Sequence, residues 1–350
     1  MTAPSPAERD ARASRVRIFM PYIHPLSFVD QDFETLSATY DVRTHDVRSP
    51  RALPAGLRQV AGADVVYCWF GSVRFLPYVV FARLLRKPVI VIAGGYDVAD
   101  ERAIGYGNMR PGVQRVLGRL LFRLATLSVA FSETSLLELR KNARVPGDRS
   151  RVIVLGFDIN HPPAPIPPAA KRRTVVAIGT IDASTIHRKG WLTVARMSRL
   201  IPDVSVVIAG KSTPAALAEL QSAAGPNVRF AGFVSSAERD ELFASATVYA
   251  QPSAHEGFGC AVAEAMLFGC VPVVSDRGSL PEVVGSSGYY VAPDDPEALA
   301  HAVRRALAEG APGPESPRER ITRLFPLSLR RTRLRALIDE LLAHKTMRTT

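Results

Sequence analysis

Cysteine is scarce in this chain of 350 residues, since Cys68, Cys260 and Cys270 are the only ones. Their spacing fits neither a disulfide framework nor a set of metal ligands, so we expect a reducing, cytoplasmic setting. Long apolar runs are also lacking. The nearest approach, residues 120–131, is interrupted by Arg123, which argues against a membrane-spanning helix. Residues 1–14 have no apolar stretch of the kind that a signal peptide needs, and we expect a disordered leader there.

Aromatic residues make up 7% of the chain, and no aromatic platform or nucleic-acid-binding motif accompanies the net charge of +11. Nucleic acid is therefore not an expected partner. A hydrophobic content of 47% beside 22% charged residues is typical of a globular protein. At 350 residues the chain is long enough for two domains that each bury a core.

Short β-branched runs alternate with amphipathic helical stretches, which predicts an α/β protein with parallel sheets built from βαβ units. In the first half, strands are expected at residues 15–20, 64–70, 88–93, 127–131 and 151–155. In the second half, they are expected at residues 174–178, 204–209, 228–233, 248–251 and 271–275.

A proline-rich segment, residues 161–173, separates the two series of strands. Proline fits neither a helix interior nor a central strand, so this segment is expected to be a stiff linker. We therefore predict two Rossmann-like domains, over residues 15–160 and 174–325, whose sheets face a central cleft. Residues 327–342 repeat apolar side chains at helical spacing, so this last helix must pack on another part of the protein.

Two glutamates, Glu256 and Glu264, lie eight positions apart around the turn Gly257-Phe258-Gly259. A strand is expected before the turn and a helix after it, which places Glu256 at the strand's carboxyl end, where parallel α/β sheets bind ligands. The helix amino terminus would offer N–H groups to an anion. An ionised Glu264 suits the paired hydroxyls of a sugar or ribose. On spacing alone, ordinary surface carboxylates are the commoner explanation.

Two neighbouring cations, Arg188 and Lys189, follow Gly179 and Thr180 in the loop after the strand at residues 174–178. A helix is expected to begin near Gly190. Two cations before a helix can neutralise a diphosphate. The alternative is a solvated surface pair without a ligand.

The residues after Glu264 read Ala-Met-Leu-Phe-Gly-Cys-Val-Pro-Val-Val-Ser-Asp-Arg-Gly-Ser-Leu-Pro-Glu-Val-Val-Gly. With them, residues 256–285 closely resemble the retaining glycosyltransferases of family 4, also called group 1, which have the GT-B fold. The resemblance is strong over residues 174–325 and present in outline over 88–160. It implies an enzyme, a hexosyltransferase, that moves a sugar from a nucleotide-diphosphate sugar to an acceptor hydroxyl without a metal or other cofactor. It also implies that the terminal segment, residues 326–350, returns to the N-terminal domain.

The resemblance gives the motif residues specific roles. Glu256 is expected to orient the donor sugar and stabilise positive charge at the anomeric carbon, while the N–H groups of residues 257–259 meet sugar and phosphate. Glu264 is expected to bind the ribose. Lys189 and Arg188 are expected to stabilise the departing diphosphate.

The chain departs from the family at Thr180, where many members carry an Arg after the first glycine, here Gly179. Either Arg188 supplies the second positive charge, or the phosphate is held with one cation fewer. Two further loops, residues 208–211 and 231–235, resemble those that flank the nucleoside. They suggest a phosphate contact for Lys211 and a contact with the base for the backbone near Val234, with plain turn glycines as the alternative.

The acceptor side is less well defined. The segment at residues 21–28 lacks the glycine-rich loop that many family members have after the first strand. Tyr96 and Asp97 follow Gly94-Gly95 at a place where relatives often show a His or a His-Asp pair facing the reacting sugar. Asp97 is a candidate catalytic residue and Tyr96 a candidate donor-binding residue, and a turn role for Asp97 is the alternative.

The positive charge is concentrated in two segments. Residues 70–130 hold nine basic against three acidic residues, and residues 314–350 hold nine against four. Arg115, Arg119 and Arg123 recur every fourth residue of an amphipathic helix. This helix suits peripheral contact with an anionic membrane, at its inner face, that would bring the enzyme to a lipid-linked acceptor. A core-facing apolar stripe with a solvated Arg edge is the alternative.

The sequence therefore predicts a retaining glycosyltransferase with a nucleotide-sugar donor and a glycan or lipid-linked acceptor. Two alternatives use the same cleft. One is a catalytically silent nucleotide-sugar-binding protein, and the other is a nucleotide-sugar epimerase of the GT-B fold. The sequence leaves the donor base, the sugar, the acceptor and the oligomeric state open.

Overall fold

The computed structural model describes residues 16–23, 27–160 and 171–347, and it divides them into two compact units. The first contains most of the chain up to Leu155 together with the residues from Ser328 onward, and the second consists mainly of Gly156–Leu327. The expected leader at residues 1–14 lies outside the described residues, as do most of the expected linker and part of the segment at 21–28.

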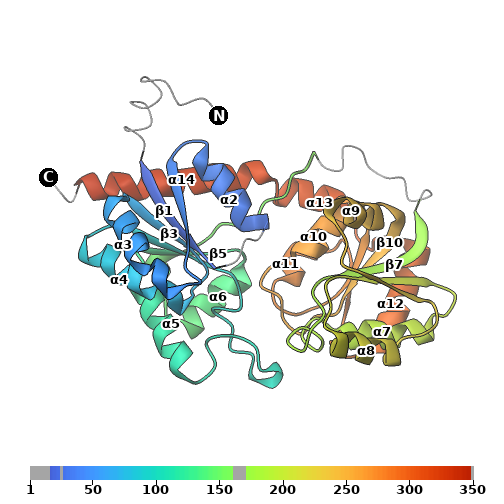
Figure 1. The fold of residues 1–350 in the computed structure, drawn as a ribbon. Helices are drawn as coiled ribbons and strands as arrows, with labels where there is room; N and C mark the ends of the chain where they lie inside the picture. The colour runs from blue at the N-terminus through green and yellow to red at the C-terminus, as the bar shows by residue number, and fades with distance from the viewer. Residues whose placement is uncertain (1–15, 24–26, 161–170, 348–350) are drawn as a thin grey trace, which may run out of the picture. The chain divides into compact units, whose positions relative to one another are not determined.

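The first unit is built on a parallel sheet of six strands in the order β2-β1-β3-β4-β5-β6 (Figure 1). The strands are β1 Arg17–Tyr22, β2 Asp41–Asp46, β3 Val65–Trp69, β4 Val89–Ala93, β5 Leu127–Ala130 and β6 Ser150–Val152. The helices are α2 Ser27–Ser37, α3 Leu53–Gly62, α4 Leu76–Leu84, α5 Val113–Leu124, α6 Glu133–Asn142 and α14 Leu327–Met347. Strands β3 and β4 are buried along their whole length, which explains why they appear as continuous apolar runs in the sequence.

The second unit repeats this plan with the strand order β12-β11-β10-β7-β8-β9. Its strands are β7 Arg172–Ile178, β8 Ser205–Ala209, β9 Val228–Gly232, β10 Ala246–Gln251, β11 Val271–Ser275 and β12 Tyr289–Val291. Its helices are α7 Trp191–Leu200, α8 Pro214–Ala223, α9 Ser236–Ser245, α10 Cys260–Leu267, α11 Leu280–Val284, α12 Pro296–Glu309 and α13 Pro317–Leu324. Capping boxes at Ser235 and Ser316 fix the starts of α9 and α13.

The prediction of five strands in each half was wrong by one strand in each. The missed strands, β2 and β12, both lie at a sheet edge. Strand β2 has the sequence Asp-Val-Arg-Thr-His-Asp and is only half-buried, so it lacks the apolar run by which a buried strand is recognised. Strand β12 has only three residues. The expected α/β class with two parallel Rossmann-like sheets is confirmed.

The predicted terminal helix packs on the first unit, as α14 (Figure 1). Arg330 is fully buried and forms a two-pronged ion pair with Asp32 of α2, with both N···O distances at 2.7 Å. Its remaining guanidinium nitrogen donates to the carbonyls of Ile153 and Val154, just after β6. Tyr67 of β3 donates to Asp32 as well. Asp32 belongs to the sequence Asp30-Gln31-Asp32, the one Asp-x-Asp of the chain. Arg330 contacts both carboxylate oxygens of Asp32.

Candidate functional site

The carboxylate of Glu256 is the centre of a buried polar cluster in the second unit. Glu256 lies in the loop between β10 and α10, five residues after the end of the strand. Its Oε1 atom is 3.0 Å from Nζ of Lys189 and 3.3 Å from Nη1 of Arg188. The two cations come from the loop before α7, so residues far apart in the sequence form one charged group.

Two neutral side chains donate to the same oxygen. Nε2 of Gln251 lies 2.9 Å from Oε1 of Glu256, and Oγ of Ser253 lies 3.1 Å from it. Burial by itself would raise the pKa of Glu256, but the charges of Lys189 and Arg188 and these hydrogen bonds outweigh it, so the pKa lies below its ordinary value. The carboxylate is therefore ionised at neutral pH.

A close packing of backbone holds the two loops together. Gly190 has φ of +69°, and a Cβ atom at this position would lie 2.5 Å from the carbonyl oxygen of Pro252. The N–H of Ala254 donates to the carbonyl of Arg188 at 2.7 Å. Only glycine permits both the left-handed backbone and this approach, which explains the Lys-Gly pair.

A second glycine, Gly278, packs directly against the backbone of Glu256. Gly278 has φ of +57°, and a Cβ atom there would lie 2.3 Å from the carbonyl oxygen of Glu256. The N–H of Ser279 donates to that same carbonyl at 3.0 Å. The backbone of Glu256 is thus fixed by the loop after β11.

The turn at residues 257–259 leads into the first turn of α10. Gly259 caps this helix in the left-handed conformation, without a side-chain capping bond. The ring of Phe258 stacks on Phe157 at 5.9 Å and meets Phe325 edge-on at 5.4 Å. The Phe258 side chain is therefore a packing element, and only its backbone can serve a ligand.

Glu264, in α10, is partly buried and lies 3.4 Å from Nη1 of Arg239 in α9. Burial raises its pKa, Arg239 opposes this shift, and the charge of Asp240 adds to it. Sequence analysis did not identify Arg239. Its position in the first turn of the helix that follows the loop at 231–235 was the available signal.

The other predicted residues of the second unit lie in the loops after β7, β8 and β9. Gly179 adjoins Lys189, since a Cβ atom at Gly179 would be 3.6 Å from Cδ of Lys189. The Thr180 side chain is exposed, and its carbonyl accepts from the indole of Trp191. Lys211 is exposed, and Val234 is half-buried beside a cavity of about 420 Å³.

Tyr96 and Asp97 belong to the first unit and are described within it. Asp97 is 3% exposed, and its two oxygens accept from the N–H groups of Gly71 at 2.6 Å and Gly94 at 2.8 Å. Burial raises the pKa of Asp97 to about 6, and the backbone hydrogen bonds oppose the shift. Its carboxylate therefore joins two loops. Tyr96 is half-exposed, and its ring packs edge-on against another tyrosine, Tyr106.

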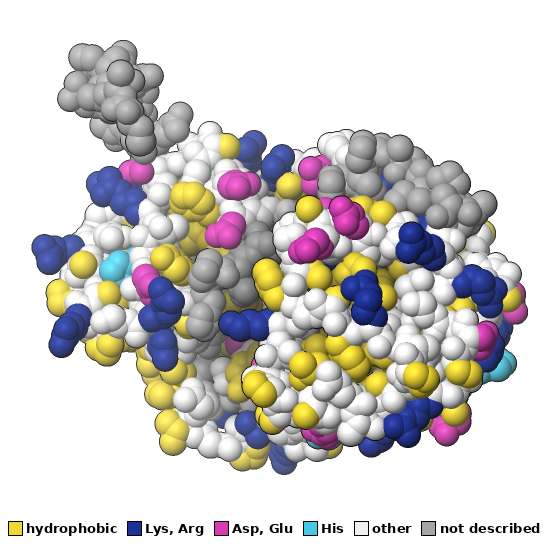
Figure 2. Space-filling view, turned by 45° about the vertical axis from the view of Figure 1, so that its right-hand side comes forward, with side chains coloured by type: hydrophobic (Ala, Val, Ile, Leu, Met, Phe, Trp, Pro, Cys, Tyr) yellow, Lys and Arg dark blue, Asp and Glu magenta, His cyan; other side chains and the backbone are white. Residues whose placement is uncertain are grey.

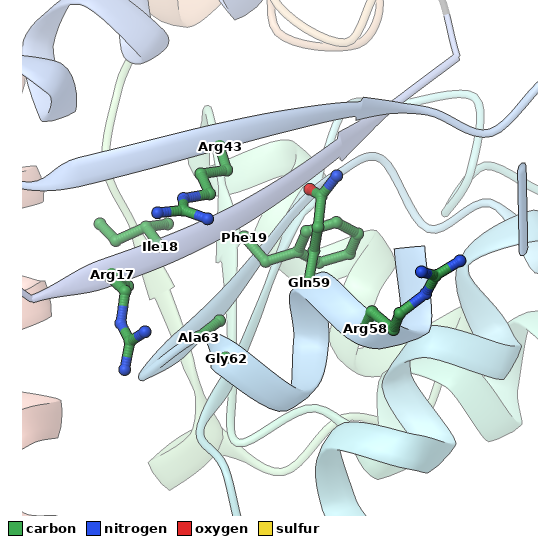
Figure 3. A pocket seen from close by; sticks show the side chains of 8 residues that line it. All are labelled: Arg17, Ile18, Phe19, Arg43, Arg58, Gln59, Gly62 and Ala63. Atoms are coloured by element: carbon green, nitrogen blue, oxygen red, sulfur yellow. The ribbon is translucent and has the colours of Figure 1, made fainter. Parts of the chain in front are cut away.

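The first unit also has a smaller pocket of about 200 Å³ beside β1, β2 and α3 (Figure 3). Gln59 points toward the strands, while the guanidinium of Arg58 points away from Gln59 (Figure 3). Arg43, on β2, is already paired with Asp41 at 3.1 Å. The pocket therefore offers less positive charge than its three arginines suggest.

An apolar surface is exposed on α4 and α5, and we call it the α4–α5 face. Its members are Val80, Leu84, Leu85, Val113, Val116 and Leu120, with exposed fractions between 39% and 75%. On α5, Gly118, Leu121 and Phe122 are buried, whereas Val113, Val116 and Leu120 are exposed, so apolar residues lie on both faces of this helix. Figure 2 shows hydrophobic and basic side chains interspersed at the lower left of the molecule.

No helix among the described residues combines the length and the apolar character that crossing a bilayer requires.

Gln251 and Ser253 were also not identified as site residues from the sequence. Both lie shortly before Glu256 in the sequence, but a Gln at the end of a strand and a Ser in a loop are common without a function. Only the folded structure shows that their side chains meet Glu256.

Comparison with known proteins agrees with this geometry. Residues 172–309 match the family model described as glycosyl transferases group 1. The chain is 37% identical over 122 residues to a GDP-mannose-dependent alpha-(1-6)-phosphatidylinositol dimannoside mannosyltransferase of Mycobacterium tuberculosis, covering 35% of this chain and 31% of the relative. It is 30% identical over 207 residues to a phosphatidyl-myo-inositol mannosyltransferase of Mycolicibacterium smegmatis. This match covers 56% of the present chain and 50% of the relative. The matches thus span half or less of these two relatives' length.

Solved structures share the fold along nearly the whole chain. Anabaena Alr3699/HepE, in complex with UDP and glucose, gives a TM-score of 0.75 at 15% identity and covers 93% of this chain and 100% of its own. Sucrose-phosphate synthase from Thermosynechococcus elongatus gives a TM-score of 0.74 at 18% identity, and the match covers 94% of this chain and 100% of the synthase chain. The predicted GT-B fold is confirmed.

Proposed function

The chain belongs to the glycosyltransferase group 1 family, and on that premise we propose that it transfers a sugar from a nucleotide-diphosphate sugar to an acceptor hydroxyl with the anomeric configuration retained. The observation that carries this proposal is the convergence of Lys189 and Arg188 on the buried carboxylate of Glu256. Two cations and an ionised carboxylate at the carboxyl end of a parallel strand suit a ligand that joins a diphosphate to a sugar.

In the proposed reaction, Lys189 and Arg188 bind the diphosphate and stabilise its negative charge as it leaves. The bond between the anomeric carbon and the phosphate oxygen breaks, and the bond to the acceptor oxygen forms on the same face. The departing phosphate oxygen takes the acceptor's proton. No separate protein base is then required. Arg188 supplies the second cation, in place of the Arg that is absent at Thr180.

Glu256 faces the sugar and stabilises positive charge at the anomeric carbon, as its lowered pKa permits. The backbone N–H groups of residues 257–259, at the start of α10, bind sugar and phosphate. Glu264 binds the ribose hydroxyls, and we propose that Arg239 keeps it ionised for this purpose. Gly179 and Thr180 border the phosphates.

The proposal places Lys211 near the phosphate and the backbone near Val234 at the base. On the acceptor side, Tyr96 offers an exposed ring to the acceptor. Asp97 shapes the acceptor pocket by holding the loops at Gly71 and Gly94 together. The donor is first tested as GDP-mannose, because one relative is named for that donor.

We propose that the acceptor is lipid-linked and that the α4–α5 face rests on an anionic membrane. The six exposed apolar side chains give this face a hydrophobic surface that would insert into the headgroup region. Arg115 and Arg123 lie on the same helix, and each cation near an anionic surface contributes about 1 kcal/mol. The names of two relatives refer to phosphatidylinositol-based substrates, in line with a lipid acceptor.

The test is a panel of UDP-, GDP- and ADP-sugars, first by thermal shift and then by transfer or slow hydrolysis. We expect one donor to be consumed by the wild type and at least 100-fold more slowly by Glu256→Ala. Glu219→Ala, at an exposed glutamate of α8, is the matched control and should retain wild-type rates. Equal rates for Glu256→Ala and the wild type would refute the proposal. An epimerised sugar from donor alone would indicate an epimerase instead.

A further inference from the structure

The Oε1 atom of Glu256 accepts from more donors than one oxygen holds in an ordinary protein environment. Lys189, Arg188, Gln251 and Ser253 all lie within 3.3 Å of it. A carboxylate oxygen has about two lone-pair sites. The contacts of Lys189 and Arg188 are thus replaceable, because Gln251 and Ser253 can satisfy this oxygen without them.

The proposed function gives the two cations another partner. A nucleotide diphosphate carries more negative charge than a carboxylate and offers more acceptor oxygens, so Lys189 and Arg188 would turn toward it on donor binding. Glu256 would then lose charge compensation while it stays buried. A buried carboxylate without hydrogen bonds is driven toward its protonated form. Neutral donors must therefore hold it ionised and in place.

Gln251 is a neutral donor that can hold Glu256 ionised and in place. It is the last residue of β10, it is almost fully buried, and the backbone of its strand is paired with β11. Its Oε1 atom accepts from the hydroxyl of Tyr249, two residues earlier on the same face of the strand, at 3.0 Å. Since a carboxylate accepts only, the amide nitrogen must face Glu256 and the amide oxygen must face Tyr249. The orientation of the amide is thereby fixed from both sides.

The Tyr249 hydroxyl is 3.0 Å from Oε1 of Gln251 and 3.2 Å from the carbonyl oxygen of Ile178, so its single proton is shared between these two acceptors, with the shorter contact to Gln251. Burial raises the pKa of this hydroxyl well above the ordinary value, so the group stays protonated throughout the physiological range. Within the part of the chain that the structure describes, the Ser253 hydroxyl has no such anchor, although the Ser253 carbonyl accepts from Ser275. Gln251 is therefore the more rigid of the two neutral donors.

We infer that Gln251, held by Tyr249, is a positioning residue that keeps Glu256 ionised and oriented while Lys189 and Arg188 bind the donor's diphosphate. This inference rests on the proposed function. It adds Gln251 to the residues that the resemblance to the family indicated, which are Glu256, Glu264, Lys189 and Arg188. It assigns Gln251 no contact with the substrate.

The experiment compares Gln251→Met with the wild type in the full chain, using the donor identified by the panel. Methionine has nearly the same length but cannot donate. We expect kcat to fall 10- to 100-fold, the dissociation constant for the nucleoside diphosphate to change less than 2-fold, and the acid limb of the kcat profile to move to higher pH. Gln221→Met, at an exposed glutamine of α8, is the matched control and should change none of these.

An unchanged kcat and an unchanged acid limb in Gln251→Met would overturn the inference, whereas a wild type that consumes no nucleotide sugar would instead refute the proposed function. If Gln251→Met does not fold, Tyr249→Phe decides the question, because it removes only the hydroxyl that anchors the amide. Tyr249→Phe should shift the acid limb in the same direction with a smaller fall in kcat, about 2- to 10-fold. A wild-type profile for Tyr249→Phe would then overturn the inference.

Discussion

Lys189 and Glu256 are separated by 67 positions in the chain, and their side chains meet with Nζ 3.0 Å from Oε1. Both groups are largely shielded from water, so the attraction between them is stronger than that of a surface pair. Glu256 is the anionic partner of Lys189 in this structure. Under the proposed function, donor binding exchanges this carboxylate for the diphosphate, and several measurements follow from this exchange.

Removing the cation should weaken diphosphate binding directly. For Lys189→Met we expect a 10- to 100-fold rise in the dissociation constant of the preferred nucleoside diphosphate, since a hydrogen bond to a charged group is worth about 1.5–3 kcal/mol. Isothermal titration calorimetry measures it. Lys141→Met, at an exposed lysine of the first unit, is the control. Unchanged affinity in Lys189→Met would remove this residue from the phosphate site.

The lowered pKa of Glu256 predicts a particular pH dependence of stability. A carboxylate whose pKa is depressed in the folded state adds stability above its unfolded value, near 4.5, and this stability is lost as the pH falls through the folded value. The wild type should therefore exceed Glu256→Gln in unfolding free energy most above pH 4.5, and the gap should narrow on acidification. Urea unfolding followed by Trp191, with Trp69 replaced by Phe in both proteins, reports on the second unit alone. A gap that stays constant from pH 7 to pH 3 would contradict this prediction.

Gly278 should tolerate no side chain. For Gly278→Ala we expect a loss of roughly 3 kcal/mol in the unfolding free energy of the second unit, because the new methyl group would meet the carbonyl of Glu256 and the backbone is left-handed. Gly269→Ala separates the cost of the left-handed backbone from the cost of the steric contact. Gly269 has φ of +74° with its nearest neighbour at 3.8 Å, so its loss should be only about 1 kcal/mol. Equal losses would mean that the contact with Glu256 contributes nothing.

The buried ion pair between Arg330 and Asp32 should be costly to break from one side. Arg330→Met leaves the carboxylate of Asp32 buried without its charge partner, and we expect a loss of about 3–5 kcal/mol from the first unit. The double variant Arg330→Met with Asp32→Leu should recover much of this loss, because no unpaired charge remains. Chemical denaturation followed by Trp69, with Trp191 replaced by Phe in every protein compared, measures both losses. A double variant no more stable than Arg330→Met would show that the loss comes from packing or from the contacts with Ile153 and Val154.

Membrane binding should depend both on the apolar side chains of the α4–α5 face and on the arginines of α5. Removing charge with Arg115→Gln and Arg123→Gln should weaken binding to vesicles of phosphatidylglycerol and phosphatidylcholine by roughly 10- to 30-fold at 0.1 M salt, and raising the salt should weaken the wild type similarly. Val116→Ser with Leu120→Ser should also weaken binding, with little salt dependence. Arg196→Gln with Arg304→Gln, in the second unit, is the charge control. Vesicle cosedimentation measures these changes, and equal binding by all variants would contradict the proposal.

The sequence by itself determined the parallel α/β class, the buried strands and the family, because each of these depends on residues that lie close together along the chain. Apolar runs bounded by glycine and proline mark β3 and β4, and the run from Glu256 to Gly285 carries the family's motif. The edge strand β2 was not predictable in the same way, since a half-buried strand shows little apolar signal.

Only the tertiary structure decided which side chains meet. It paired Glu264 with Arg239, packed Phe258 between Phe157 and Phe325, and brought Gln251 to Glu256. The physical reason is that hydrogen bonds and ion pairs depend on distances of a few ångströms between atoms from different loops. Residue type and spacing along the chain set what each side chain can do, but the packing of the loops sets which partner it finds.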